Sequence, residues 1–151
     1  MPADAWVMHD SIKEYIGDGT VDLDADSFRI NLYLVTSDIA TTSENAIATI
    51  TNQHASANGY TQDTEAINAP TWVESAGTVT FDVSGADPAW TASTGSIIAR
   101  FAGIYDDTVT TPVIDPLVCH SLLDNSPDDV TVTDGNTLTI QMNASGVFTV
   151  A

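Results

Sequence analysis

The chain has 151 residues, 43% of them hydrophobic, and its 21 acidic residues against three Lys and Arg give a formal net charge of −18. A chain of this length suffices for one domain that buries about 70% of its unfolded surface, and its hydrophobic content predicts folding in spite of the charge. Because phosphate backbones bind Lys and Arg, nucleic acid and anionic membranes are not expected partners.

Asp outnumbers Glu by 17 to 4 and occurs among Thr, Ser and Asn in segments that read as loops. Short polar side chains in loops bond to nearby backbone, so we interpret the charge as a solvated exterior rather than a cation-binding device. A lone Cys119 cannot form an internal disulfide, and residues 2–10 lack the features of a signal peptide. No apolar run is long enough to span a membrane, and we expect synthesis in a reducing cytoplasm.

The N-terminal segment predicts a short helix. Apolar side chains recur there at helical spacing, at Met8, Ile12, Tyr15 and Ile16. Ser11 followed by Glu14 has the form of a capping box, and the helix is expected to end near Gly17. A strand follows, in which Phe28, Ile30, Leu32 and Leu34 alternate with Arg29, Asn31 and Tyr33. Residues 44–53 predict a further short helix, and residues 54–71 read as loop.

The second half of the chain predicts short strands separated by turns. Val79, Phe81 and Val83 alternate with polar residues, residues 97–105 form an apolar strand suited to cover on both faces, and Pro116 interrupts a strand over residues 112–123. Further short strands are expected at residues 130–132, 138–142 and 147–150. This pattern predicts one all-β domain over residues 1–151, an antiparallel β-sandwich or jelly-roll-like fold with two short helices.

Alternating carboxylates form the candidate metal site. They are Asp18, Asp22, Asp24 and Asp26. An EF-hand loop counted from Asp22 would need Gly at its sixth position and Glu at its twelfth, where this chain has Ser27 and Tyr33. We therefore interpret the run as a solvated turn and expect no metal site and no cofactor.

The sequence contains no convincing catalytic constellation. Cys119 and His120 are adjacent, but neighbouring residues in a strand point to opposite faces and do not form a nucleophile and its base. Cys119 is instead expected in the core. His9 and His54 lack ligand-like spacing, and the paired Asp106 and Asp107 read as a turn, so we expect no enzyme and no catalytic residue.

Four residues are candidate contacts with a partner: Trp6, Val7, Trp72 and Trp90. Residues 1–8 are a candidate N-terminal arm that reaches to a neighbour, and the alternative is that Trp6 folds back onto the core. Trp72 and Trp90 lie beside Pro70 and Pro88, where packing in the core or anchoring of loops is the alternative to an interface.

Four segments, in order, resemble a family of small structural proteins of tailed bacteriophages and prophages. Residues 13–34 read KEYIGDGTVDLDADSFRINLYL, residues 77–82 GTVTFD, residues 99–108 ARFAGIYDDT and residues 138–148 LTIQMNASGVF. The resemblance covers nearly the whole chain and carries no catalytic residue.

The resemblance implies a virion component made in the host cytoplasm. It is either a head decoration (cement) protein on the outer capsid surface or a part of the neck, tail or fibre. A decoration protein binds the major capsid protein over seams of the shell, typically as a homo-oligomer, and we expect a trimer. A carbohydrate-binding or receptor-binding module is the alternative from another class, with Trp72, Trp90 and Tyr105 as its candidate platform.

Overall fold

The computed structural model describes residues 3–126 and 128–151, and strands in antiparallel sheets make up 36% of the chain and helices 8%. This confirms the prediction of an all-β, sandwich-like domain with a short helix. The helical elements are α1 (Asp10–Asp18) and the 3-10 turn η1 (Ile47–Thr49). The strands in the described ranges are β1 (Val7–Met8), β2 (Phe28–Tyr33), β3 (Ala66–Ile67), β4 (Pro70–Ser75), β5 (Thr78–Val83), β6 (Ala89–Thr91), β7 (Ile97–Ala99), β8 (Phe101–Asp106), β9 (Leu117–Leu122), β10 (Val130–Val132), β11 (Thr137–Thr139) and β12 (Phe148–Val150).

Five strands form the main sheet, in the order β1-β9-β8-β2-β3. β2 pairs with β8 along its whole length, from Phe28 opposite Asp106 to Tyr33 opposite Phe101. The register of β8 and β9 shifts between Ile104 and Tyr105, close to Pro116, which directly precedes β9. A bulge at this position agrees with the prediction for a proline in this segment.

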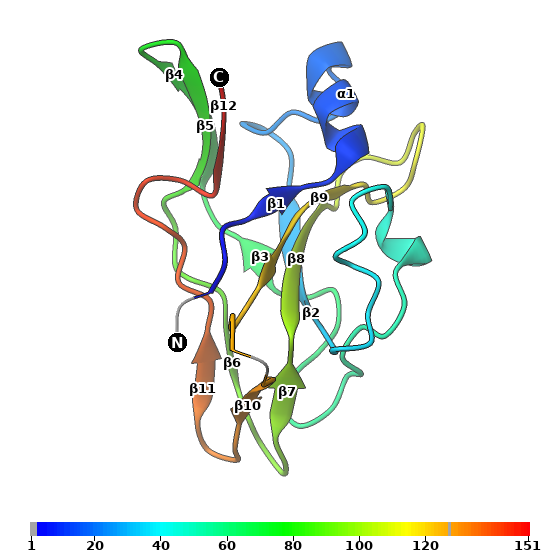
Figure 1. Cartoon of the computed structure of the whole chain (residues 1–151), viewed down its shortest axis with the longest axis vertical. Coiled ribbons are helices and arrows are strands. Elements are labelled where there is room, and N and C mark those ends of the chain that lie inside the picture. The colour runs from blue at the N-terminus through cyan, green and yellow to red at the C-terminus, as the bar shows by residue number, and fades with distance from the viewer. Residues whose placement is uncertain (1–2, 127) are drawn as a thin grey trace.

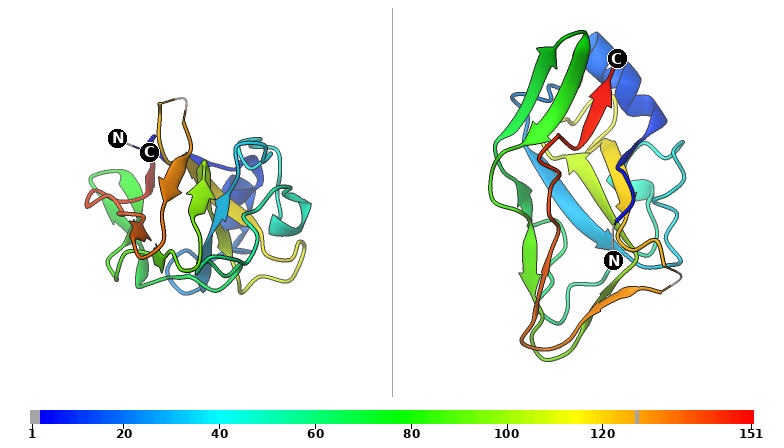
Figure 2. Two further views of the ribbon diagram at one scale, coloured as in Figure 1. Left: turned by 90° about the horizontal axis from the view of Figure 1, so that it is seen from below. Right: turned by 60° about the vertical axis from the view of Figure 1, so that its left-hand side comes forward.

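A second layer faces the main sheet (Figure 2, right). The sheet β12-β5-β4 lies at the α1 end of the molecule, and the pair β11-β6 lies at the other end (Figure 1). The main core fills the space between the layers. Phe81 on β5 is fully buried, with its ring centroid 5.5 Å from that of Phe28 on β2 and 5.2 Å from that of Phe148 on β12.

The outer face of the main sheet is also covered. Tyr33, Ile39, Tyr105 and Leu117 form a second, smaller buried cluster, against which Ile47 of η1 packs. The central strands are therefore buried on both faces, as predicted for the apolar segment that contains β8. The strand predicted here is confirmed as β2, and burial extends to both of its faces, because Asn31 and Tyr33 are buried as well.

Burial of Asn31 is balanced by hydrogen bonds. Its side-chain amide donates to Asp63 Oδ1 at 2.5 Å, and its Oδ1 accepts from the backbone N–H of Asp63 at 3.0 Å and from the Tyr60 hydroxyl at 3.3 Å. A buried amide with these partners costs far less than an unpaired one. Polar residues on β2 thus anchor the segment after η1 instead of facing solvent.

The N-terminal helix begins earlier than the predicted capping box implies and ends one residue later than predicted. Its N-cap is His9, which makes no side-chain capping bond, so the predicted capping box of Ser11 and Glu14 does not form. The helix passes Gly17 and ends at Gly19, whose left-handed φ of 78° suits glycine. None of the helices in the described residues is long and apolar enough to cross a membrane.

Four other elements differ from the sequence prediction. The helix expected at residues 44–53 is reduced to η1, and the expected loop at residues 54–71 contains β3 and the start of β4. The strand expected at residues 97–105 is broken at Arg100, whose backbone N–H bonds to the carbonyl of Tyr33. The strand expected at residues 138–142 ends at Thr139, after which Ile140 and Met142 bond to Pro88 and Asp87 outside the ladder.

Candidate functional site

The predicted contact residues lie on three separate elements. Trp6 is half-buried against the main core, and Val7, 44% exposed, pairs with His120 on β9. Trp72 on β4 packs its ring 6.2 Å from that of Phe148. Trp90 on β6 is buried. These residues do not form one contiguous contact surface.

The candidate N-terminal arm belongs to the main sheet in this structure. The backbone N–H of Asp4 donates to Leu122 O at 2.9 Å, the Ser121 hydroxyl donates to Asp4 O at 2.8 Å, and His9 N–H donates to Val118 O at 3.1 Å. Trp6 therefore folds back onto the core, as the alternative interpretation has it. Residues 1 and 2 of the candidate arm lie outside the described residues.

The aromatic platform for carbohydrate is not an exposed surface. Tyr105 is 1% exposed and Trp90 is 5% exposed, and Trp72 is partly covered by the core. Stacking of a sugar needs an open ring face, which Tyr105 and Trp90 do not offer. The prediction that these three residues form a binding platform is corrected accordingly.

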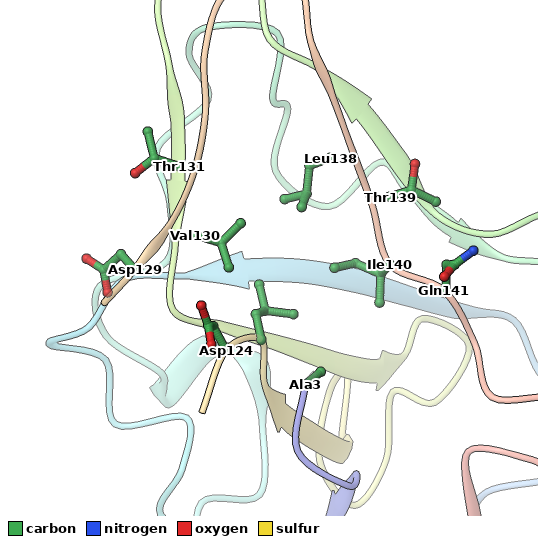
Figure 3. Close-up of a pocket in the computed structure, with 10 residues that line it drawn as sticks. Ala3, Asp124, Asp129, Val130, Thr131, Leu138, Thr139, Ile140 and Gln141 are labelled. Carbon is green, nitrogen blue, oxygen red and sulfur yellow. The ribbon is translucent and has the colours of Figure 1, made fainter. Parts of the chain in front are cut away.

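A cavity with a volume of about 610 Å³ opens between β10 and β11 (Figure 3). Its apolar floor includes Leu123, Leu138 and Ile140. Asp124 and Asp129 stand at one end of it, and the pKa of Asp124 is lowered mainly by a hydrogen bond from the backbone of Ser126. That carboxylate is therefore ionised at neutral pH.

A second cavity of about 340 Å³ continues the first toward the N-terminal strand. Both cavities are lined by Ala3, Leu123, Ile140 and Gln141, and the second extends along Trp6 to Gly146. We call the two together the trough. The trough follows the seam between the main sheet and the second layer. Three carboxylates line it: Asp4, Asp124 and Asp129. No Lys, Arg or His of the described residues lines it.

A buried histidine pair lies beside β1. His120 Nδ1 is 3.3 Å from His9 Nε2, and the ring centroids are 5.1 Å apart. Val7 pairs with His120, so His9, two residues further along, is its diagonal neighbour on the same face. Burial lowers the pKa of both rings, that of His120 to about 4, with a further contribution from His9. Both rings are therefore neutral at pH 7.

A buried carboxyl group, Asp106, ends β8, and the half-buried Asp26 lies near it. Asp106 is fully buried, and its Oδ1 accepts from the backbone N–H groups of Thr108 at 2.7 Å and Val109 at 3.2 Å. Burial raises the pKa of Asp106 to about 7, and the charge of nearby Asp26 adds to the rise. Oδ2 of Asp106 is buried without a hydrogen-bond partner among the described residues, so the ionised form is poorly solvated there.

The carboxylates of the candidate metal run bond to backbone. Asp18 Oδ1 accepts from Thr20 N–H, Asp22 Oδ1 from Asp24 N–H and Asp26 Oδ2 from Asp22 N–H, at 2.7–3.0 Å. These are the local bonds of a turn. Across residues 3–126 and 128–151, no group of three or more His, Cys, Asp or Glu side chains is arranged to hold a metal ion.

The remaining candidate catalytic residues are separated by the sheet. Cys119 is fully buried in the main core, and burial raises the pKa of its thiol, whereas His120 faces His9. His54 bonds to backbone through both ring nitrogens. Asp106 ends β8, and Asp107 pairs with Arg29 at 2.7 Å. The two histidines and the two carboxyl groups that do meet come from distant parts of the chain.

Comparison of the chain with family models, with curated proteins and with solved structures finds no match.

Proposed function

We propose that the chain is a non-enzymatic structural protein of a bacteriophage virion, a decoration protein that binds the outer capsid shell and stabilises it. The observation that carries the proposal is the ordered resemblance of four segments to the phage family. These segments are also the framework of the fold. Residues 13–34 and 99–108 contain the paired strands β2 and β8. Residues 77–82 contain most of β5, and residues 138–148 run from β11 to Phe148, the first residue of β12, which pairs with Phe81 on β5.

The charge of the chain supports this role. A formal net charge of −18 keeps a protein present in many copies soluble and prevents adhesion to packaged nucleic acid. Binding to a shell requires complementary surfaces and no chemistry. Binding to the assembled shell in preference to its free subunits stabilises the shell by mass action.

We propose further that the chain acts as a homo-oligomer, a trimer suited to local threefold positions of a shell. This follows from the expected symmetry of decoration proteins. Exposed large apolar side chains of the described residues are spread over several elements, among them Val73 on β4, Ile98 on β7 and Val150 on β12. A symmetric assembly would bury part of this set.

The proposal is tested with capsids stripped of this chain. Purified stripped capsids are heated or diluted into low salt, with and without the re-added chain, and intact shells are counted by electron microscopy. We expect re-addition to raise the temperature at which shells break. Equal survival with and without the chain would contradict a stabilising decoration role.

A further inference from the structure

The trough has the form of a binding site for an extended peptide. Its two parts are continuous, and its apolar floor lies between polar walls that include Thr131 of β10, Thr139 of β11 and Gln141. In Figure 3 the side chains of Val130, Leu138 and Ile140 point into the space between the strands. An apolar floor with polar rims favours alternating apolar and polar side chains on the ligand.

The strands beside the trough each have one unpaired edge. β10 pairs only with β7, and β11 pairs only with β6, in the part of the chain that the structure describes. β10 lies between β7 and β11, so its unpaired side faces the trough (Figure 1). An extended segment laid there gains backbone hydrogen bonds in the manner of an added strand.

The charge of the trough selects the kind of segment. Asp4, Asp124 and Asp129 line it, and no Lys, Arg or His of the described residues does. Arg100, which lies near enough to Asp124 to lower its pKa, donates to the backbone carbonyls of Ser126 and Asp128. The carboxylates at the trough therefore favour a ligand with its own cation.

The cationic side chains of a second copy of this chain already have partners. Arg29 is paired with Asp107 at 2.7 Å, and Lys13 lies 3.6 Å from Asp10 on α1. With Arg100 already bonded to backbone, all three cationic side chains of the chain have partners. Charge complementarity thus points to a different protein.

We propose that the trough binds an extended segment of another protein in which Lys or Arg stands among alternating apolar and Thr-like side chains. The apolar side chains occupy the floor at Leu138 and Ile140, and the cation meets Asp124 and Asp129. This inference concerns the chain itself and is independent of whether the chain covers a capsid.

The test is an array of randomised decapeptides, half of which contain Lys or Arg and half of which contain neither, probed with the full chain. We expect the binders to come from the first half. Their affinity is then measured by fluorescence anisotropy against the Asp129→Lys and Thr131→Arg variants, and we expect binding at least about tenfold weaker. Glu14→Lys changes the charge equally on α1, at the far end of the molecule (Figure 1), and is expected to leave affinity unchanged.

Three results would overturn the proposal. One is an array without binders, and another is a set of binders that lack Lys and Arg. The third is an equal loss of affinity in Asp129→Lys and Glu14→Lys, which would indicate attraction to the net charge alone. Circular dichroism of each variant establishes that the fold is retained, and Thr131→Arg changes an exposed side chain and leaves the apolar floor intact.

Discussion

Replacement of Asp106 by Asn should stabilise the protein at alkaline pH. Asp106 is fully buried, and burial together with the charge of nearby Asp26 raises its pKa to about 7. A carboxyl group whose pKa is raised in the folded state contributes stability that is complete below the unfolded pKa, about 3.9, and is lost as pH rises through the folded value. Asn keeps an acceptor for the two backbone N–H groups and carries no charge.

The magnitude follows from the pKa. A rise of about 3 units corresponds to about 4 kcal/mol between low pH and pH 8, at 1.36 kcal/mol per unit. We therefore expect Asp106→Asn to raise the free energy of unfolding by about 2–4 kcal/mol at pH 8, and by about 1 kcal/mol or less at pH 4.5.

Urea unfolding followed by Trp fluorescence measures the free energy of unfolding of the variant and the parent protein at both pH values. The matched control is Asp107→Asn, which removes only the half-exposed pair with Arg29 and should cost at most about 1 kcal/mol. A gain for Asp106→Asn that is equal at both pH values, or a loss at pH 8, would refute the argument from the raised pKa of Asp106.

Further predictions concern acid, the core and a tight turn. The pKa of His120 is lowered to about 4, so the neutral ring contributes stability that is present above pH 6.5 and is lost on acidification. In His120→Asn, the decrease of the unfolding free energy between pH 6.5 and pH 4 should be smaller by about 2–3 kcal/mol. An unchanged decrease would contradict this. Phe81→Ala should lower the unfolding free energy by about 3–5 kcal/mol in urea titrations, because this ring is fully buried between the layers. Gly146→Ala should cost clearly more than Gly135→Ala in thermal melts: both have positive φ, 96° and 81°, but only at Gly146 would a Cβ lie 2.3 Å from Thr80 Cγ2. Equal losses for the two glycines would show that the close contact is relieved at no cost.

Much of the sheet framework is predictable from alternation alone. Phe28, Ile30 and Leu32 all lie in the core, and the strand around Phe81 pairs as its pattern suggests. Alternation does not predict burial where the second face of a strand is covered as well. Tyr33 alternates with the apolar residues of β2 but is buried as well, in a cluster with Ile39, Tyr105 and Leu117.

The candidate sites were beyond the reach of local patterns. His9 and His120 are 111 residues apart, and only the register that places Val7 opposite His120 brings the rings together. The trough likewise exists because β10 and β11, neighbours in sequence, pair with different strands and diverge. The sequence contains one indication of the trough. The apolar alternation of Leu138 and Ile140 continues beyond the end of β11, and both side chains line the cavity.

The central claim, a decoration protein of the capsid, is tested most directly by the copy number of this chain relative to the major capsid protein in purified virus particles, measured by quantitative mass spectrometry. We predict near-stoichiometric amounts, as a covering of the shell requires. A handful of copies per particle would contradict this and would place the chain at the neck, the tail or a fibre.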